Sequence, residues 1–278
     1  MAWRFWGSLA VLWAGCAFTA MAQNAPATDY VPQRGQIGKD VIWVPTPVPL
    51  IEKMLSTARV TSDDRLFDLG AGDGIIAITA AQQRGAQAVG IEYNPDMADF
   101  ARRKVREAGV EGKVKIITGD IFKEDFSSAT VVTLYLLPDL NMRLRPTILK
   151  MKPGTRILSH AFTMGDWEAD EVIAHENFRG YFWWVPAQLE GEWVVTGAQG
   201  GPLKLTFHQQ FQKIGGLLQR DSQTLPLIGA RLRGEDLSFQ FMTPDRRVHT
   251  FSGRIEGTQM TGTVTTDNLI TPIKGSRL

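Results

Sequence analysis

Three glycines stand close together in the segment "LFDLGAGDG" (residues 66–74). Gly70, Gly72 and Gly74 carry no side chain, so the backbone of this turn can approach a bound molecule closely. Their spacing is Gly-x-Gly-x-Gly. Dinucleotide-binding turns use Gly-x-Gly-x-x-Gly instead, and they place a pyrophosphate at a helix N-terminus. The spacing therefore favours a nucleotide-like ligand of a different class.

Four acidic residues lie at or just beyond the ends of predicted strands. Asp68 precedes the glycine turn and Asp73 lies within it, where a carboxylate repels a pyrophosphate and attracts a cation. Glu92 ends the next strand, in "AVGIEYN", where its carboxylate can accept hydrogen bonds from both hydroxyls of a ribose. Asp120 follows the third strand, in "IITGDIF", where it can accept an adenine amino group while the Ile121 amide meets the ring. The set predicts a cationic, adenosine-containing cofactor such as S-adenosylmethionine.

The elements that must position these residues follow from the apolar pattern between residues 65 and 160. Strands are predicted over 65–69, 88–92, 114–118, 131–136 and 156–160, and helices over 74–84, 95–108 and 141–151. Such alternation is typical of a doubly wound α/β fold, in which a mostly parallel, Rossmann-like sheet has helices on both faces. Ligands of this fold bind at the carboxyl ends of the strands, so we expect the acidic set to gather there.

A proline segment precedes the first helix, in "VIWVPTPVPLIEKMLS". Pro45 and Pro47 exclude a helix interior at their positions. Apolar residues recur at helical spacing from Leu50 onward, and Pro49 is tolerated in the first turn of such a helix. Thr46 lies in the extended part, which we expect to fold over the cofactor.

The pattern changes near residue 188. Short alternating runs separated by glycines continue to residue 278, which is typical of an antiparallel meander. The sequence therefore predicts a domain over residues 41–187 and a small β-rich domain over 188–278. The stretch "GEWVVTG" resembles the Gly-x-Trp of lipocalin-like strands, although a glycine turn before a packed tryptophan is the simpler interpretation.

Residues 1–22 have the layout of a secretory signal peptide, with one charge at Arg4, an apolar run and a small-x-small end. An uncleaved membrane anchor that leaves the chain facing the cytoplasm is the alternative, because the run is near the shortest length that spans a bilayer. Lipidation at Cys16 is a third. The sequence thus predicts an exported or periplasmic chain, with residues 23–40 as a polar linker.

Composition disfavours several kinds of partner and site. The 30 lysines and arginines nearly balance the 29 aspartates and glutamates, so a nucleic-acid partner is not favoured. The single cysteine, Cys16, permits neither an internal disulfide nor a cysteine-based metal cluster. The four histidines lack the spacing of metal ligands, and no metal is expected.

Residues 41 to about 185 resemble a class I, seven-strand S-adenosylmethionine-dependent methyltransferase. Within that superfamily they are most similar to the ATP synthase c-subunit lysine methyltransferases and their bacterial relatives. The stretches that carry the resemblance are "VPTP", "DLGAGDG", "GIEYNP" and "VVTLYLLPDLNMRLRPTILKMKPGTRILSH". The resemblance implies methyl transfer from S-adenosylmethionine, with a protein lysine as a candidate acceptor. It does not cover residues 190–278.

One departure from the superfamily concerns the acceptor. Many amino-group methyltransferases carry Asn/Asp-Pro-Pro-Tyr/Phe after the fourth strand, where this chain has "TLYLLPD". Tyr135, in that stretch, is our first candidate for lining the acceptor channel, and Thr46 is the second. His160 ends the fifth strand and can serve as a base near neutral pH, although a buried core histidine is the simpler interpretation. Trp183 and Trp184 are interpreted as buried strand residues.

Two other functions compete with methyl transfer. One is a secreted or envelope binding protein that keeps the methyltransferase-like fold as a scaffold beside a lipocalin-like β domain. The other is a dehydrogenase, which the glycine spacing disfavours. The presence of Asp68, Glu92 and Asp120 together favours the enzyme, because a scaffold has no need of all three.

Overall fold

The computed structural model describes Met1 and residues 30–39, 42–197, 201–220 and 222–278. Apart from Met1, the predicted leader lies outside the described residues, as do residues 23–29 and 40 of the predicted linker, so export stays a prediction. Among the described residues, no helix is long and apolar enough to cross a membrane. The described strands form two sheets, one of seven strands and one of nine.

The first sheet has the strand order β3-β2-β1-β4-β5-β7-β6. Its strands are β1 (Arg65–Leu69), β2 (Gln87–Glu92), β3 (Val114–Thr118), β4 (Val131–Leu134), β5 (Arg156–His160), β6 (Glu171–His175) and β7 (Phe178–Trp184). β1 to β5 are parallel, whereas β7 is antiparallel to both of its neighbours, β5 and β6. This arrangement confirms the predicted doubly wound, mostly parallel sheet.

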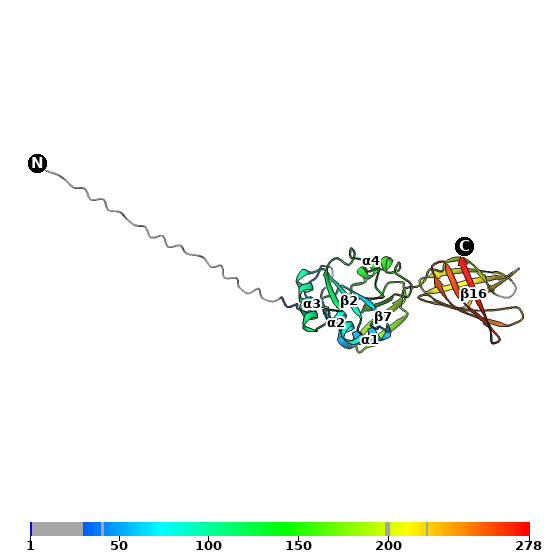
Figure 1. Cartoon of the computed structure of the whole chain (residues 1–278), viewed down its shortest axis with the longest axis horizontal. Helices are drawn as coiled ribbons and strands as arrows, with labels where there is room; N and C mark the ends of the chain where they lie inside the picture. Colours follow the sequence, from blue (N-terminus) through cyan, green and yellow to red (C-terminus); the bar gives the residue numbers. More distant parts are fainter. Residues whose placement is uncertain (2–29, 40–41, 198–200, 221) are drawn as a thin grey trace. The chain divides into compact units, whose positions relative to one another are not determined.

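Helices cover both faces of this sheet (Figure 1). They are α1 (Val48–Thr57), α2 (Ile75–Arg84), α3 (Pro95–Glu107) and α4 (Pro138–Ile148). The first three pack on one face through an apolar cluster that includes Leu55, Ala77 and Ala101. The fourth packs on the other face, in a cluster with Leu144 and Trp183. Each strand in the middle of the sheet is therefore buried on both sides, as a parallel sheet requires.

β4 and α4 differ from their predicted bounds. The strand ends at Leu134 instead of residue 136, and the helix spans Pro138–Ile148 instead of residues 141–151. Proline at the first helical position needs no N–H partner and has a suitable φ, so Pro138 starts the helix early. Tyr135 and Leu136 consequently lie in the short connection at the carboxyl end of β4.

Two helices begin directly after the strands that supply acidic residues. Gly74 is the N-cap of α2 and has a φ of +77°, a left-handed conformation that favours glycine. Asn94 caps α3, and its side chain accepts the backbone N–H groups of Asp96 and Met97. Both helix N-termini therefore lie at the edge of the sheet where the acidic set was predicted.

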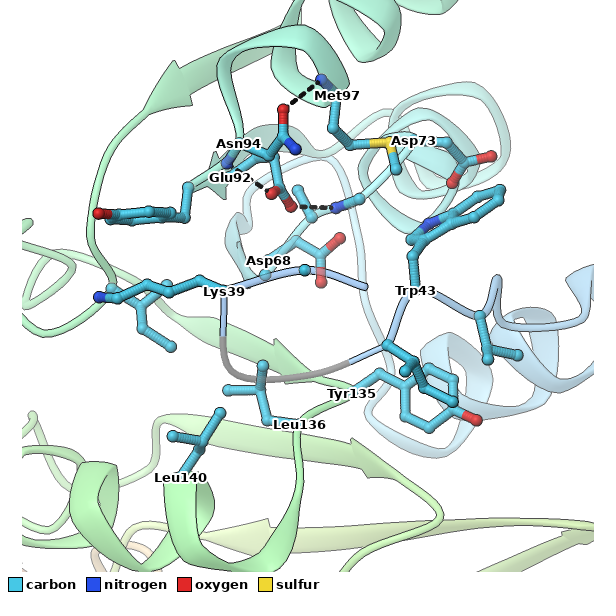
Figure 2. Close-up of a pocket in the computed structure, with 18 of the residues that line it drawn as sticks. Lys39, Trp43, Asp68, Asp73, Glu92, Asn94, Met97, Tyr135, Leu136 and Leu140 are labelled. Carbon is cyan, nitrogen blue, oxygen red and sulfur yellow. Dashed lines mark hydrogen bonds between the residues drawn. The ribbon is translucent and has the colours of Figure 1, made fainter. Parts of the chain in front are cut away.

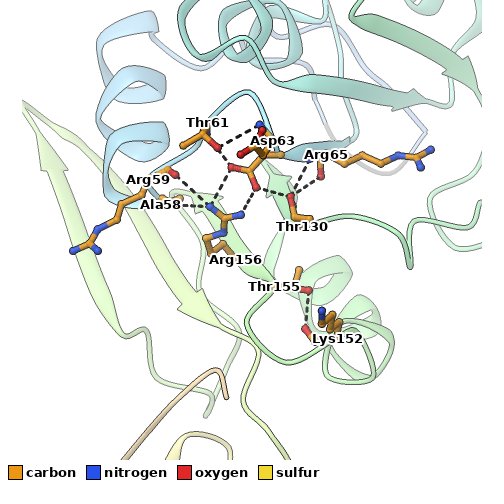
Figure 3. Close-up of polar contacts among 10 residues, drawn as sticks. Ala58, Arg59, Thr61, Asp63, Arg65, Thr130, Lys152, Thr155 and Arg156 are labelled. Carbon is orange, nitrogen blue, oxygen red and sulfur yellow. Dashed lines mark hydrogen bonds and ion pairs between the residues drawn. The ribbon is translucent and has the colours of Figure 1, made fainter. Parts of the chain in front are cut away.

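A buried ion pair joins the amino ends of the parallel strands, at the opposite edge of the sheet (Figure 3). Asp64 pairs with Arg156 and also accepts the Thr61 N–H at 2.9 Å and the Thr130 hydroxyl at 2.7 Å. Arg156 donates further to the Ala58 carbonyl at 2.9 Å. Burial alone would raise the pKa of Asp64, but these hydrogen bonds outweigh burial and hold the pKa below its usual value.

The second sheet is antiparallel and has the order β11-β10-β9-β8-β16-β15-β14-β13-β12. Its strands are β8 (Gly191–Thr196), β9 (Leu203–Gln210), β10 (Lys213–Arg220), β11 (Gln223–Pro226), β12 (Ile228–Arg233), β13 (Asp236–Met242), β14 (Val248–Glu256), β15 (Gln259–Thr266) and β16 (Leu269–Arg277). The two edge strands follow each other in the chain, so the sheet curves strongly around one apolar core. That core includes Phe207, Phe239 and Phe251.

Trp193, in the stretch "GEWVVTG", is fully buried in this core. Its Nε1 donates to the Leu189 carbonyl at 2.9 Å. A packed tryptophan after a glycine turn therefore accounts for the stretch. The change from one sheet to the other falls between Trp184 and Gly191, and the domain boundary at residue 188 stays a prediction.

Candidate active site

A cavity of about 620 Å³ lies at the carboxyl ends of β1, β2 and β4 (Figure 2). It contains both predicted acceptor-side residues and every predicted cofactor residue except Gly74, which caps α2 instead. The predicted residues that line the cavity are Thr46, Asp68, Gly70, Gly72, Asp73, Glu92, Asp120, Ile121 and Tyr135. These residues come from segments far apart in the sequence, and the parallel strands bring them to one edge.

Asp68 is the most deeply buried carboxylate of the cavity, with 2% of its surface exposed. It lies on β1 beside Thr133 of β4, whose hydroxyl donates to Asp68 Oδ1 at 2.7 Å. Burial and the carboxylates of Asp73 and Glu92 raise the pKa of Asp68 to about 7, although the hydrogen bond from Thr133 opposes the shift. The negative charge of Asp68 is therefore costly unless a cation lies beside it.

Glu92 ends β2 and holds the glycine turn in place. Its Oε2 accepts the Gly72 N–H and its Oε1 accepts the Asn94 N–H, each at 2.9 Å. A carboxylate offers about four lone-pair sites, so both oxygens can still accept further hydrogen bonds from a ligand.

Asp73 has a different environment from Asp68. Lys104 of α3 pairs with its Oδ2 at 2.6 Å, and the Ile75 N–H points to its Oδ1 at 3.3 Å. Its charge is thus largely compensated within the protein. Asp73 lines the cavity as predicted, but its local contacts are those of a residue that anchors the start of α2 to α3.

Asp120 follows β3 and lines the cavity. Its Oδ1 accepts the Phe122 N–H at 3.0 Å, and Lys39 pairs with its Oδ2 at 3.1 Å. These contacts, the hydrogen bond from Phe122 foremost, hold the pKa of Asp120 below its usual value. The Lys39 ammonium also lies 4.2 Å from the centre of the Tyr93 ring, a cation–π distance.

The segment before α1 forms a wall of the cavity that the sequence did not predict in full. The Gly35 N–H donates to the Trp43 carbonyl at 2.8 Å, and the Trp43 N–H donates to Gln36 at 2.9 Å. Figure 2 shows Lys39 and Trp43, both from this segment, on either side of Asp68 in the view. Residues 36–39, which the sequence assigned to a linker, therefore contribute to the cavity.

Trp43 packs against the glycine turn. A Cβ atom on Gly72 would lie 2.6 Å from Trp43 Nε1, and Gly72 has a φ of +53°. Only glycine meets both conditions at this position without strain. The glycine turn is thus shaped for the tryptophan as well as for a ligand, and the apolar "VIWVP" run is the sequence signal for this contact.

Apolar side chains complete the cavity and were not predicted as site residues. They are supplied by the N-terminal segment, α3, the connection after β4, α4 and the loop after β5: Ile37, Ile42, Val44, Met97, Leu136, Leu137, Leu140 and Phe162. Such residues are typical of ligand cavities, which are mostly apolar with a few placed polar groups. Their apolar types give no signal that separates them from core residues.

The predicted acceptor-side residues meet at the end of β5. Thr46 Oγ1 lies 3.0 Å from His160 Nδ1, and the rings of Tyr135 and His160 are 3.9 Å apart. Thr46 and Tyr135 line the cavity, whereas His160 lies behind them with 2% of its surface exposed. Burial raises the pKa of Tyr135 and lowers the pKa of His160 to about 4, so neither side chain is charged at neutral pH.

Comparison with known proteins identifies this kind of site. The model of the ANTKMT methyltransferase domain matches residues 68–171. A protein-lysine N-methyltransferase of Saccharolobus islandicus is 43% identical over 139 residues, which cover 49% of this chain and 86% of the relative. The chain belongs to this family of S-adenosylmethionine-dependent methyltransferases.

This chain is also similar to two other methyltransferases. The solved structure of an RNA methyltransferase from Salinibacter ruber, in complex with S-adenosyl-L-homocysteine, is 47% identical, with a TM-score of 0.52. The match covers 52% of this chain and 96% of the chain of the RNA methyltransferase. The human lysine N-methyltransferase of the ATP synthase c-subunit is 30% identical over 131 residues, so the chain spans about half of its length (55%). The predicted resemblance is confirmed.

The cavity of the methyltransferase fits its cofactor, S-adenosylmethionine. Asp68 offers a buried carboxylate whose pKa is raised by burial and by the neighbouring carboxylates of Asp73 and Glu92, so a cation beside it would stabilise its charged form. Glu92 and Asp120 place carboxylates on the neighbouring strand ends β2 and β3. No comparison supports the alternative of a secreted binding protein, and family membership excludes the dehydrogenase.

Proposed function

We propose that the chain transfers a methyl group from S-adenosylmethionine to the side-chain amine of a protein lysine. The observation that carries this proposal is the 43% identity to a protein-lysine N-methyltransferase over 86% of that relative's length. The family model's match, over residues 68–171, contains the cavity's carboxylates and Tyr135. The uncharged side chains on the acceptor side of the cavity also support the proposal.

For the cofactor, we assign three carboxylates to three polar groups. Asp68 faces the ammonium, because its buried charge needs a cation. Glu92 accepts the ribose hydroxyls with the lone pairs that Gly72 and Asn94 leave unused. Asp120 accepts the adenine amino group beside the Ile121 amide. Lys39, which pairs with Asp120, must then share or give up that contact.

The acceptor side contains Thr46, Tyr135 and Phe162, and none of these side chains is charged at neutral pH. An uncharged, largely apolar surface disfavours an ammonium and therefore favours the neutral amine, which is the nucleophilic form. Phe162 lies 6.3 Å from Tyr135 between ring centres, and the two rings line one side of the cavity.

Bound S-adenosylmethionine supplies a sulfonium methyl carbon: the amine lone pair forms the N–C bond, the C–S electron pair stays on sulfur, and the product amine loses one proton. The protein's own residues contribute position and exclusion of water. Among the residues that line the cavity, we assign none as a general base, because Asp68 and Glu92 are committed to the cofactor.

The experiment that tests this function identifies which molecules receive a labelled methyl group. Full-length protein is incubated with methyl-labelled S-adenosylmethionine and a bacterial extract, which is then separated into protein and RNA and hydrolysed. We expect label in ε-N-methyllysine, and much less of it with the Asp68→Asn variant when S-adenosylmethionine is not saturating. Label in methylated nucleosides and none in lysine would contradict the proposal and would favour the activity named for the Salinibacter ruber relative.

A further inference from the structure

The contact between Thr46 and His160 joins two segments 114 residues apart, and it lies directly behind the acceptor side of the cavity. Thr46 comes from the proline segment before α1, with 5% of its surface exposed. His160 is the last residue of β5. Oγ1 of Thr46 and Nδ1 of His160 are 3.0 Å apart, so one of the two must donate a hydrogen to the other.

The surroundings of His160 make it a neutral imidazole. The ring packs at a tilt against Tyr135, with ring centres 3.9 Å apart, and meets Phe178 edge-on at 5.9 Å. Burial lowers its pKa to about 4. A histidine with so low a pKa holds an abstracted proton poorly at neutral pH, and His160 is not among the residues that line the cavity. These facts argue against its use as the general base.

The backbone after His160 is held in an unusual shape. Ala161 has a φ of +65°, and the Phe162 N–H donates to the His160 carbonyl at 2.8 Å, which closes a tight turn. The Ser159 hydroxyl donates to the Phe162 carbonyl at 2.7 Å, and Asn141 donates to the Thr163 carbonyl at 3.2 Å. A non-glycine residue at positive φ persists only where its surroundings enforce it, so the position of His160 is tightly determined.

We infer that His160 is a positioning residue that accepts the hydroxyl hydrogen of Thr46 at Nδ1 and so leaves the lone pairs of Thr46 Oγ1 facing the cavity. A hydroxyl has one hydrogen and two lone pairs, so a Thr46 hydroxyl that donates to His160 can only accept from a ligand. The incoming amine donates an N–H to Oγ1 and keeps its own lone pair for the methyl carbon. This inference rests on the proposed function.

The other tautomer leads to a different outcome. If His160 carried its hydrogen on Nδ1, Thr46 would accept it, and the threonine hydrogen would point to the cavity. Thr46 would then donate to the amine lone pair, which is the pair that must attack the methyl carbon. The tautomer of His160 therefore decides whether Thr46 assists or blocks the reaction.

Kinetics of full-length variants test the inference. Thr46→Val removes the hydroxyl with little change of shape, and we expect kcat on a lysine substrate to fall about tenfold, the equivalent of about one hydrogen bond. His160→Leu should cause a similar fall. The double variant should be no worse than either single variant, because both remove one shared contact. Thr46→Ser and His160→Asn keep the donor and an acceptor, and both should retain most of kcat.

Two controls separate positioning from packing. Phe178→Leu also loosens the packing of His160 but leaves the Thr46 contact in place, so it should lower stability without the fall in kcat. Calorimetry should show the same S-adenosylmethionine affinity for wild type and Thr46→Val. Nitrogen NMR of labelled His160 should show hydrogen on Nε2 and a bare Nδ1 between about pH 6 and pH 8.

Additive losses in the double variant, or hydrogen on Nδ1 of His160, would overturn the inference. So would a Thr46→Val variant with wild-type kcat. Failure of the proposed function looks different: the wild-type chain would then methylate no lysine at all while binding the cofactor normally, and the NMR result for His160 would still report the tautomer.

Discussion

The carboxylates of the cavity differ in how far their charge is compensated by their neighbours. Asp73 has a lysine partner at 2.6 Å, and Asp120 has one at 3.1 Å. Within the part of the chain that the structure describes, Asp68 has only a hydroxyl donor, and Glu92 has only backbone donors. A cationic or hydroxyl-rich ligand should therefore stabilise the charges of Asp68 and Glu92 more than those of Asp73 and Asp120.

This difference predicts unequal effects of neutral substitutions. Glu92→Gln should weaken S-adenosylmethionine binding by about 1–3 kcal/mol, because charge-assisted acceptors are lost. Asp73→Asn should weaken binding much less and should lower stability instead, because its partner Lys104 is left unpaired. Titration calorimetry and urea denaturation of both variants measure the two effects. Equal loss of affinity in both variants would contradict the distinction.

The elements of the first sheet position the site, and the contacts at the far edge hold these elements together. Asp64 and Arg156 link the start of β1 to the start of β5, and Thr130 adds the segment before β4. The side chains of the pair are 7% and 14% exposed. Removal of one partner from so buried a pair leaves the other charge without compensation.

We expect Asp64→Asn to lower the free energy of unfolding by about 3–5 kcal/mol at pH 7. The pKa of Asp64 is depressed in the folded protein, so its contribution is fully present above the unfolded value of about 4 and is lost as the pH falls through the lower folded value. The difference between wild type and variant, measured by urea denaturation, should thus shrink below about pH 4. A difference in unfolding free energy between wild type and Asp64→Asn that does not change with pH would contradict this assignment.

Much of the site could be predicted because its residues sit at the ends of strands with clear apolar patterns. Asp68, Glu92 and Asp120 are examples. Contacts between distant segments could not be predicted: the partner of Asp73 is 31 residues away on α3, and the partner of Thr46 is 114 residues away on β5. The contribution of residues 36–39 to the cavity was missed because they fall in the mostly polar stretch 23–40, which was predicted as a linker. The contact of Trp43 with Gly72 was missed because it joins two segments that are not adjacent in the sequence.

At the scale of the whole molecule, the cavity and the second sheet share no lining residue. The cavity's residues run from Gln36 to Phe162. The first residue of the second sheet is Gly191. Phe211, next to β9, nevertheless stacks on the buried Trp167 at 5.9 Å, and Gln212 donates to the Glu168 carbonyl at 2.7 Å. Phe211 therefore packs on the buried Trp167, and neither Phe211 nor Gln212 lines the cavity.

A truncated chain of residues 31–187 should accordingly bind S-adenosylmethionine with the affinity of residues 31–278. It should also associate more readily, because loss of Phe211 uncovers Trp167 and exposed apolar patches promote association. Calorimetry, with circular dichroism to confirm folding and light scattering to measure association, checks both statements. A folded truncation without cofactor affinity would show that residues 188–278 complete the site, and that the predicted boundary is wrong.

The central claim is that the buried carboxylate of Asp68 is what holds the cationic end of the cofactor. Its pKa of about 7 in the free protein requires that binding favour the ionised form, so the complex carries fewer protons than the free protein near and below pH 7. Calorimetric titration of residues 31–278 with S-adenosylmethionine near pH 6 and pH 8, in buffers of different ionisation enthalpy, measures affinity and proton release together. We predict tighter binding near pH 8, proton release near pH 6, and an Asp68→Asn variant that binds more weakly by about 1.5–3 kcal/mol near pH 8 and releases no proton. Wild-type affinity and proton release in Asp68→Asn would contradict the account.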